Sequence, residues 1–269
     1  MFQLSDLFAA PKPVIGMLHI APLPGAPRYD GNLPAIRERL LHDLDALQRG
    51  GVHGLMLENF GDVPFYPERV PAIVVAHITA LAVAVRERSS LPLGINVLRN
   101  DGRSALAVAH AAGADFIRVN VLCGARVTDQ GITSGIAHDL LRDRAALGAE
   151  QVRIFADVNV KHSAPIASRP LADETADMIH RGGADALIVS GSATGNAADV
   201  NEIEQVAAAA GDTPVLVGSG VSAESLPQLI KFADGFIVGT AVKRDGVVGN
   251  PVDAARVSAL MDALGRWLS

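Results

Sequence analysis

The chain is poor in cysteine, in aromatic residues and in clustered positive charge. Its 269 residues contain a single cysteine, Cys123, which excludes an internal disulfide and suits a reducing compartment such as the cytoplasm. Aromatic residues make up only 4% of the chain while 49% of it is hydrophobic, a balance that indicates a large aliphatic core. The net charge is −6 and no run of Lys or Arg exceeds two residues, so we expect no nucleic-acid partner.

The sequence also lacks an apolar run long enough to cross a membrane. The longest such stretch, residues 71–85, is too short for a span and contains His77 and Thr79. We expect it to form a helix that is buried on nearly all sides, either within one chain or at the contact between copies of a homo-oligomer. The first eight residues have neither a basic segment nor a long apolar stretch, so no signal peptide is predicted and a cytoplasmic location is expected.

Eight apolar, strand-like runs alternate with eight helical patterns along the chain. The strand-like runs are Val14–His19, Val52–Asn59, Leu93–Val97, Phe116–Asn120, Val152–Val158, Ala186–Ser190, Val215–Gly218 and Phe236–Gly239. The helical patterns lie near 33–49, 68–88, 101–112, 135–148, 171–182, 199–210, 223–233 and 251–268. This alternation predicts a parallel sheet with right-handed crossovers. We therefore predict an α/β fold, a single (β/α)8 TIM barrel over residues 1–269, with residues 1–12 packed on the barrel.

The predicted loops differ in length at the two ends of the barrel. Segments that lead from a helix into a strand are short, whereas several that follow a strand are long and either polar or rich in proline and glycine. The long ones are Ile20–Asn32, Phe60–Pro67, Val121–Thr133 and Val160–Pro170. Long loops often carry functional residues. Here they all follow the carboxyl ends of strands, where the active sites of TIM barrels lie.

Polar residues stand at the ends of successive predicted strands. Because side chains alternate along a strand, one parity points into the barrel and should bring these residues together. We expect catalytic roles for Glu58, Arg118 and Asp157, and substrate-binding roles for His19, Asn59, Asn96, Asn120, Asn159 and Ser190. Burying so many polar groups without a purpose is costly. The alternative is a hydrogen-bonded plug in which Arg118 pairs with Glu58 or Asp157.

Lys161 and His162 directly follow the fifth predicted strand and add two candidates for catalysis. Together with Asp157 they offer a base, an electrostatic clamp and an acid at one strand end. A desolvated lysine also forms Schiff bases, although Lys161 is placed on a loop. The alternative is an exposed pair of residues on a mobile lid.

Two glycine-terminated strands predict a phosphate site. The segments Val215–Val221 and Gly235–Lys243 each run from a buried strand into a glycine turn, whose backbone N–H groups are left uncovered. The last two strands of a TIM barrel often hold phosphate in this way. The expected phosphate ligands are Gly191, Gly218, Ser219, Gly220, Gly239, Thr240 and Lys243, with further donors within Ser190–Gly195. The alternative is that these turns are merely tight crossovers.

No metal site is predicted, and the cofactor is unknown. His19, Glu58, Asp157 and His162 are of ligand type, but no metal-binding spacing joins them. Mg²⁺ remains open, because it needs only one or two carboxylates together with a phosphate. Cys123 lies in no cysteine–histidine motif and is expected to be an unreactive thiol.

Four motifs stand out, and the first two of them are unusually specific. Pro13–Pro27, Leu57–Phe65, Ala156–His162 and Val189–Gly195, with the closing segment Val217–Val221, resemble the BtpA family, and the similarity runs over almost the whole chain. The resemblance implies a ribulose-phosphate-binding barrel. It also implies histidine in many relatives where this chain has Asn159. The family takes its name from a cyanobacterial factor needed for accumulation of photosystem I reaction-centre proteins, but its members also occur without photosynthesis, some beside sugar-transport genes.

The leading hypothesis is an enzyme that acts on a small phosphorylated sugar, nucleoside or related metabolite. Isomerisation, aldol-type cleavage and glycosyl-bond hydrolysis all suit a barrel mouth rich in carboxylates. The alternative hypothesis is a non-catalytic biogenesis factor or metabolite-binding protein that uses the same barrel to hold a partner or ligand.

Overall fold

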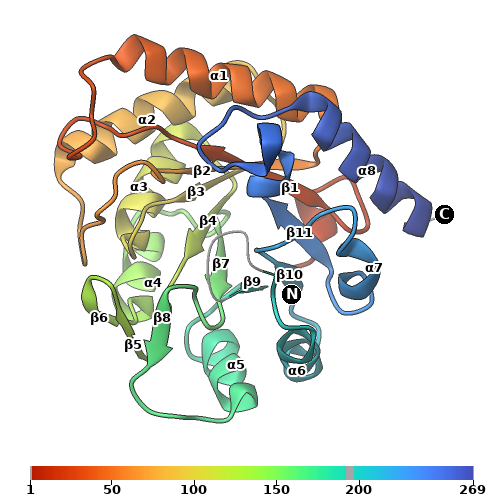
Figure 1. Cartoon of the computed structure of the whole chain (residues 1–269). Coiled ribbons are helices and arrows are strands. Elements are labelled where there is room, and N and C mark those ends of the chain that lie inside the picture. Colours follow the sequence, from red (N-terminus) through yellow and green to blue (C-terminus); the bar gives the residue numbers. More distant parts are fainter. Residues whose placement is uncertain (1, 192–196, 269) are drawn as a thin grey trace.

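The computed structural model describes residues 2–191 and 197–268, and its core is a closed barrel of eight parallel strands (Figure 1). The strands are β1 (Val14–His19), β2 (Gly54–Glu58), β3 (Leu93–Asn96), β4 (Phe116–Val119), β7 (Arg153–Asp157), β9 (Ala186–Val189), β10 (Val215–Val217) and β11 (Gly235–Val238). Their order around the barrel is β1-β11-β10-β9-β7-β4-β3-β2. The predicted TIM barrel is confirmed, and each predicted strand lies within two residues of an observed one at both ends.

Helices cover the outside of the barrel, and each follows a strand (Figure 1). They are α1 (Leu33–Gly50), α2 (Ala72–Arg86), α3 (Gly102–Ala112), α4 (Ala137–Ala146), α5 (Leu171–His180), α6 (Val200–Ala210), α7 (Leu226–Leu229) and α8 (Ala254–Leu268). Short 3₁₀ turns are η1 (Leu4–Asp6), η2 (Thr240–Val242) and η3 (Arg244–Gly246). No helix among the described residues has both the length and the apolar character needed to cross a membrane.

Side chains that accept backbone hydrogen bonds fix several helix starts. Asn32 accepts from the Ala35 N–H before α1, and Asp101 accepts from the Ser104 N–H before α3. Helix α7 is much shorter than the predicted 223–233. Ser222 and Ser225 instead form a turn, in which the hydroxyl of each accepts from the N–H of the other, so the helix begins only after it.

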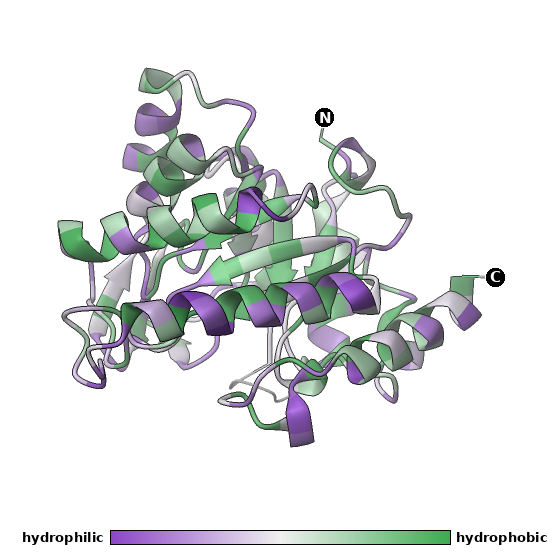
Figure 2. Cartoon of the chain, turned by 90° about the horizontal axis from the view of Figure 1, so that it is seen from above, coloured by the Kyte–Doolittle hydropathy of each residue, from purple (hydrophilic) through white to green (hydrophobic). Residues whose placement is uncertain are grey.

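Two separate apolar clusters lie on the two faces of the strands. One fills the space between the strands and the helices, and the strands at the centre are largely hydrophobic (Figure 2). The other fills the barrel interior with Ile15, Met17, Met56, Phe116, Phe155, Ala186, Ile188, Leu216 and Ile237. These interior residues follow the alternation that the sequence predicts for β1, β2, β4, β7 and β9.

Aromatic rings close the amino-terminal half of the barrel interior. The rings of Phe116 and Phe155 stack with centroids 4.6 Å apart. Gly94 makes room for this stack, because a Cβ there would lie 2.2 Å from the Phe116 ring. Phe2 and Phe8, from the segment before β1, pack into the same cluster. The interior is therefore filled with apolar groups, and polar side chains are left to the carboxyl ends of the strands.

A three-stranded antiparallel sheet stands where the sequence predicts long loops. It is formed by β5 (Ala125–Thr128) and β6 (Gly131–Ser134), from the segment after β4, and by β8 (Ser163–Pro165), from the segment after β7. Strands of three or four residues are too short for a period to be read in the sequence. The sheet ties two of the long segments together beside the mouth of the barrel (Figure 1).

A buried ion pair links the segment after β11 to helix α1. Lys243 Nζ lies 2.6 Å from Asp43 Oδ2, and the other oxygen of Asp43 accepts from the Val252 N–H at 2.7 Å. Both charged side chains are almost fully buried. The side chain of Lys243, which the sequence analysis expects to bind phosphate, is thus engaged in this pair. Its ammonium is already bound by a carboxylate on a helix outside the barrel.

This ion pair gives a first prediction. Lys243→Met leaves the Asp43 carboxylate buried without its cation, so the free energy of unfolding should fall by about 3 kcal/mol, measured by urea denaturation. Adding Asp43→Asn removes the uncompensated charge and keeps an acceptor for the Val252 N–H. The double variant should therefore recover part of the loss, and a double variant less stable than Lys243→Met would contradict this account.

Candidate functional site

A cavity of about 230 Å³ opens at the carboxyl ends of the barrel strands. Its walls come from the ends of β1, β2, β4, β10 and β11 and from the segment after β7. The lining residues are Met17, His19, Glu58, Phe60, Arg118, Lys161, Gly218, Ser219, Gly220, Val221, Ser222, Ile237, Gly239, Thr240 and Ala241. The structure thus brings together nine of the residues that the sequence predicts for catalysis, substrate and phosphate.

The two glycine turns form one wall of this cavity. A Cβ at Gly218 would lie 2.6 Å from the Ile188 side chain and 3.1 Å from Ser190 Oγ, and a Cβ at Gly239 would lie 3.1 Å from His19 Cε1. Glycine is therefore needed at Gly218, and at Gly239 it leaves room for the His19 ring.

Backbone donors are available in the same turns. Among the described residues, the N–H groups of Gly220, Val221, Thr240 and Ala241 donate to no carbonyl or side chain. In other proteins, N–H groups left uncovered on neighbouring turns are typical ligands of anions.

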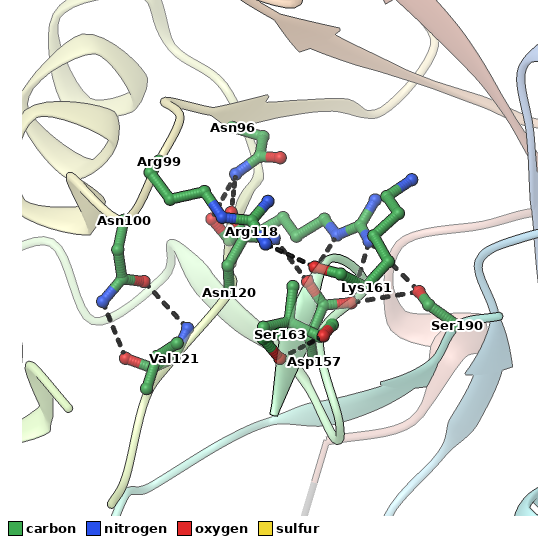
Figure 3. Close-up of polar contacts among 11 residues, drawn as sticks. Asn96, Arg99, Asn100, Arg118, Asn120, Val121, Asp157, Lys161, Ser163 and Ser190 are labelled. Carbon is green, nitrogen blue, oxygen red and sulfur yellow. Dashed lines mark hydrogen bonds and ion pairs between the residues drawn. The ribbon is translucent and has the colours of Figure 1, made fainter. Parts of the chain in front are cut away.

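A buried network of polar side chains surrounds Asp157 at the end of β7 (Figure 3). Its carboxylate accepts from Arg118 Nε at 3.1 Å and from Arg118 Nη2 at 2.8 Å. Asn120 Nδ2 donates to the same carboxylate at 2.5 Å, and Ser190 Oγ at 3.4 Å. Asn96 in turn donates to the Arg118 carbonyl and to Asn120 Oδ1.

This network changes the roles expected for its members. Asp157 is 1% exposed and its two oxygens are occupied by donors, so it holds Arg118 in place and is not available as a base. Of the two pairings considered for a structural plug, Arg118 with Asp157 is the one that forms. The guanidinium nevertheless reaches the cavity wall, so Arg118 serves both the network and the site.

His19 and Glu58 form a second pair, at the neighbouring ends of β1 and β2. His19 Nε2 lies 3.8 Å from Glu58 Oε1, and the His19 ring stacks on Phe60 at 4.6 Å between centroids. Burial lowers the pKa of His19 well below its ordinary value, and the nearby Lys243, Lys161 and Arg118 add repulsion. Burial raises the pKa of Glu58, partly offset by Arg118 and Lys161.

The opposite shifts have the same physical cause. Burial favours the neutral forms of both His19 and Glu58, so the cavity holds a neutral imidazole beside a carboxyl group that keeps its proton to a higher pH than an exposed glutamate. Within the described chain, His19 Nδ1 is buried and has no hydrogen-bond partner. Phe60, which orients this ring, was missed by the sequence analysis because its segment was treated only as a loop.

Lys161 lines the cavity from the segment after β7, with its side chain near the Arg118 guanidinium (Figure 3). Burial lowers the pKa of its ammonium, and Arg118 lowers it further, against the opposing effect of Glu58 and Asp157. Arg99 Nη2 donates to the Lys161 carbonyl and so fixes this segment. Arg99 is buried and was also missed, because nothing in its local sequence separates it from a surface arginine.

Other predicted site residues lie outside the main cavity. Asn59 accepts from the Leu98 N–H and donates to the Asp62 carboxylate. These two hydrogen bonds link the segment after β2 to the segment after β3. His162 is exposed and does not line the cavity. Gly191 is buried at the end of β9, and the donors predicted at residues 192–195 fall in a segment outside the described residues.

A second cavity, of about 240 Å³, lies on the other side of Asp157, beside the small sheet. Asn120, Asp157 and Asn159 line it, together with Cys123 and Arg126. Asn159 Nδ2 donates to Glu202 at 2.6 Å. Burial raises the pKa of the Cys123 thiol, which disfavours the reactive thiolate. Within residues 2–191 and 197–268, no three His, Cys, Asp or Glu side chains are grouped so that they could hold a metal ion.

Solved structures share this barrel at low sequence identity. N-(5'-phosphoribosyl)anthranilate isomerase from Pyrococcus furiosus matches with a TM-score of 0.57 and 15% identity, covering 95% of this chain and 99% of that one. N-acetylmannosamine-6-phosphate 2-epimerase from Clostridium perfringens matches with a TM-score of 0.56 and 14% identity, covering 91% and 92% of the two chains. At this identity the likeness establishes the fold alone.

Two relatives are far closer in sequence. An uncharacterized protein of Thermococcus kodakarensis is 48% identical over 251 residues, which cover 93% of this chain and 94% of that protein. The photosystem I biogenesis protein BtpA of Synechocystis is 44% identical over 266 residues, which cover 99% of this chain and 92% of that protein. The family model for BtpA matches residues 10–266. This chain therefore belongs to the BtpA family.

Proposed function

We propose that this protein is an enzyme that acts on a small phosphorylated sugar or related metabolite. The substrate phosphate binds the backbone of the glycine turns after β10 and β11, and the reacting carbon faces His19, Glu58 and Lys161. One observation carries the proposal. A single cavity has uncovered backbone N–H groups on one wall and buried acid–base side chains on another.

Relatives of the fold support the class of substrate. The Pyrococcus furiosus isomerase acts on a phosphoribosyl compound and the Clostridium perfringens epimerase on N-acetylmannosamine 6-phosphate, as their names state. Phosphate sites after the seventh and eighth strands are common in TIM barrels. Here the corresponding strands, β10 and β11, end in the two glycine turns of the cavity.

The geometry favours proton transfer over glycosyl-bond hydrolysis. Glycosidases generally use two carboxyl groups that flank the bond they break. Of the two predicted carboxylates, Asp157 is occupied by Arg118 and Asn120, which leaves Glu58 alone on the cavity. One carboxyl group beside a neutral histidine suits proton abstraction next to a carbonyl, as in isomerisation or aldol-type cleavage.

A second function, that of a biogenesis factor, is supported by the close similarity to the Synechocystis protein. Helix α2 has apolar residues on its outer face, where Ile73 is 49% and Val83 38% exposed. This face suits a contact with a second copy or with another protein. A homo-oligomer and a cytoplasmic location both remain predictions, and neither decides between the two functions.

Phosphate binding can be tested with inorganic phosphate. At a hundred times its dissociation constant, phosphate should stabilise the protein by about 2.7 kcal/mol, seen as a rise in Tm. Gly239→Ala places a methyl group against His19 at the cavity wall and should weaken phosphate binding by about tenfold, or roughly 1.4 kcal/mol. Gly249→Ala is the matched control, because a Cβ there meets nothing within 4 Å.

The result separates the two functions. Phosphate stabilisation that survives in Gly249→Ala and is lost in Gly239→Ala supports the proposed site. If phosphate raises the Tm of neither the unaltered protein nor the control, the anion site is absent and the biogenesis role is favoured.

The pH dependence of stability tests the environment of Glu58. A carboxyl group whose pKa is raised by folding binds its proton more tightly when folded, so its ionisation removes stability as pH rises from the unfolded pKa to the folded one. Glu58→Gln lacks this loss. The variant should therefore gain stability relative to the unaltered protein between pH 4 and pH 7, measured by urea denaturation.

The exposed residue Glu87, which directly follows α2, provides the matched control for that experiment. Glu87→Gln should follow the unaltered protein across the same pH range. A Glu58→Gln variant whose relative stability falls as pH rises would show that the folded protein stabilises the Glu58 carboxylate, contrary to the assigned environment.

A further inference from the structure

We propose that Lys161 is a nucleophilic amine that forms an imine with the substrate, so that the substrate is a phosphorylated aldehyde or ketone. This inference rests on the proposed function and makes it more specific. It assigns a covalent role to a residue that lies in the same cavity as the glycine turns.

The surroundings of Lys161 differ from those of the other three lysines. Lys243 is bound by Asp43, Lys12 donates to the Ala233 carbonyl, and Lys231 is exposed. Lys161 is half-buried, and in the described part of the chain no group accepts a hydrogen bond from its Nζ and no carboxylate lies within 4.0 Å of it. It is thus a partly desolvated amine that lines the cavity and, among residues 2–191 and 197–268, has no partner to hold its proton.

The charges around Lys161 favour the neutral amine. Arg118 and Arg99 are the cations that act on it, and Glu58 and Asp157 are the carboxylates. Arg118 and Asp157 are paired with each other, so their opposite charges partly offset at the lysine, and burial remains the main cause of its lowered pKa. A lysine next to another cation in a desolvated site loses its proton more readily and becomes a nucleophile.

The chemical step uses only groups at the cavity. The nitrogen lone pair of the neutral Lys161 amine attacks the carbonyl carbon, a C–N bond forms as the C=O π bond breaks, and the oxygen takes up the proton that this nitrogen releases. Loss of that oxygen as water, with a second proton supplied by Glu58 in its acid form, leaves a protonated imine. The imine then accepts the electron pair when a bond to the adjacent carbon breaks. No oxidant or metal enters the balance.

The position of the backbone supports this role. Arg99 donates to the Lys161 carbonyl, so the lysine is anchored although it lies in a loop. An anchored nucleophile and an anchored phosphate at one small cavity restrict the substrate to a carbonyl compound whose phosphate is only a few atoms from the reacting carbon.

Pyridoxal 5'-phosphate, which carries both an aldehyde and a phosphate, is a direct probe. The full-length protein is treated with the aldehyde near pH 7, the imine is reduced with borohydride, and the labelled lysines are identified by peptide mass spectrometry. Lys161 should be labelled at least about tenfold faster than Lys231, because the bound phosphate holds the aldehyde near the amine. Inorganic phosphate should protect Lys161 and leave the labelling of Lys231 unchanged.

Two variants complete the test. Lys161→Arg keeps the positive charge but cannot form an imine, so the fast label should disappear while phosphate still raises the Tm. Lys231→Arg is the control and should keep the fast, phosphate-protected label. A circular dichroism spectrum and Tm close to those of the unaltered protein establish that each variant is folded.

The outcomes separate this inference from the proposed function. If phosphate raises the Tm but Lys161 reacts no faster than Lys231, the imine role is overturned and the phosphate site stands. If phosphate neither raises the Tm nor protects any lysine, the proposed function itself fails. If a fast label at Lys161 is not protected by phosphate, the lysine is reactive but does not share the anion site, which also overturns the inference.

Discussion

The buried carboxylate of Asp157 determines how the other charges at the mouth of the barrel are placed. It is held at the end of β7, and its two oxygens accept from Arg118, Asn120 and Ser190. A buried carboxylate needs this many donors, because without them its desolvation would be costly. Since Arg118 is thereby fixed, its guanidinium stands at the cavity with a constant orientation. The ion pair between Asp157 and Arg118 thus places the Arg118 guanidinium beside Lys161. The same pair lies between the cavity at the strand ends and the cavity beside the small sheet.

The architecture could be predicted almost completely from the sequence, because it depends on two periods of apolar residues. One is the helical period, and the other is the alternation along strands. Alternation along β1, β4 and β7 separates residues that face the helices from residues that face the barrel axis, and this parity also placed His19, Glu58 and Arg118 correctly. Glycine at the ends of β10 and β11 pointed to the turns that line the cavity. These signals are local, so one chain is enough to find them.

The parts that could not be predicted depend on contacts between distant segments. Lys243 follows a glycine turn, as a phosphate-binding lysine would, but its partner Asp43 lies 200 positions away on α1. The sequence predicts Asp157 as a catalytic residue, but in the fold its carboxylate is paired with Arg118. The small sheet of β5, β6 and β8 joins two loops through pairings across a gap in sequence. In each case the residue type is evident in the sequence, while its partner is decided only by the fold.

Lys161 and Lys243 are two desolvated lysines with different surroundings in one barrel. Both are desolvated, and burial lowers the pKa of both. Lys243 has Asp43 at 2.6 Å, so its charge is matched and it serves as a structural link. Lys161 has Arg118 nearby, and that cation strengthens the effect of burial on the ammonium. A buried lysine without a carboxylate partner is costly for stability, and proteins retain such groups chiefly where reactivity requires them. The surroundings of Lys161 therefore support the proposed imine role, whereas those of Lys243 support a structural one.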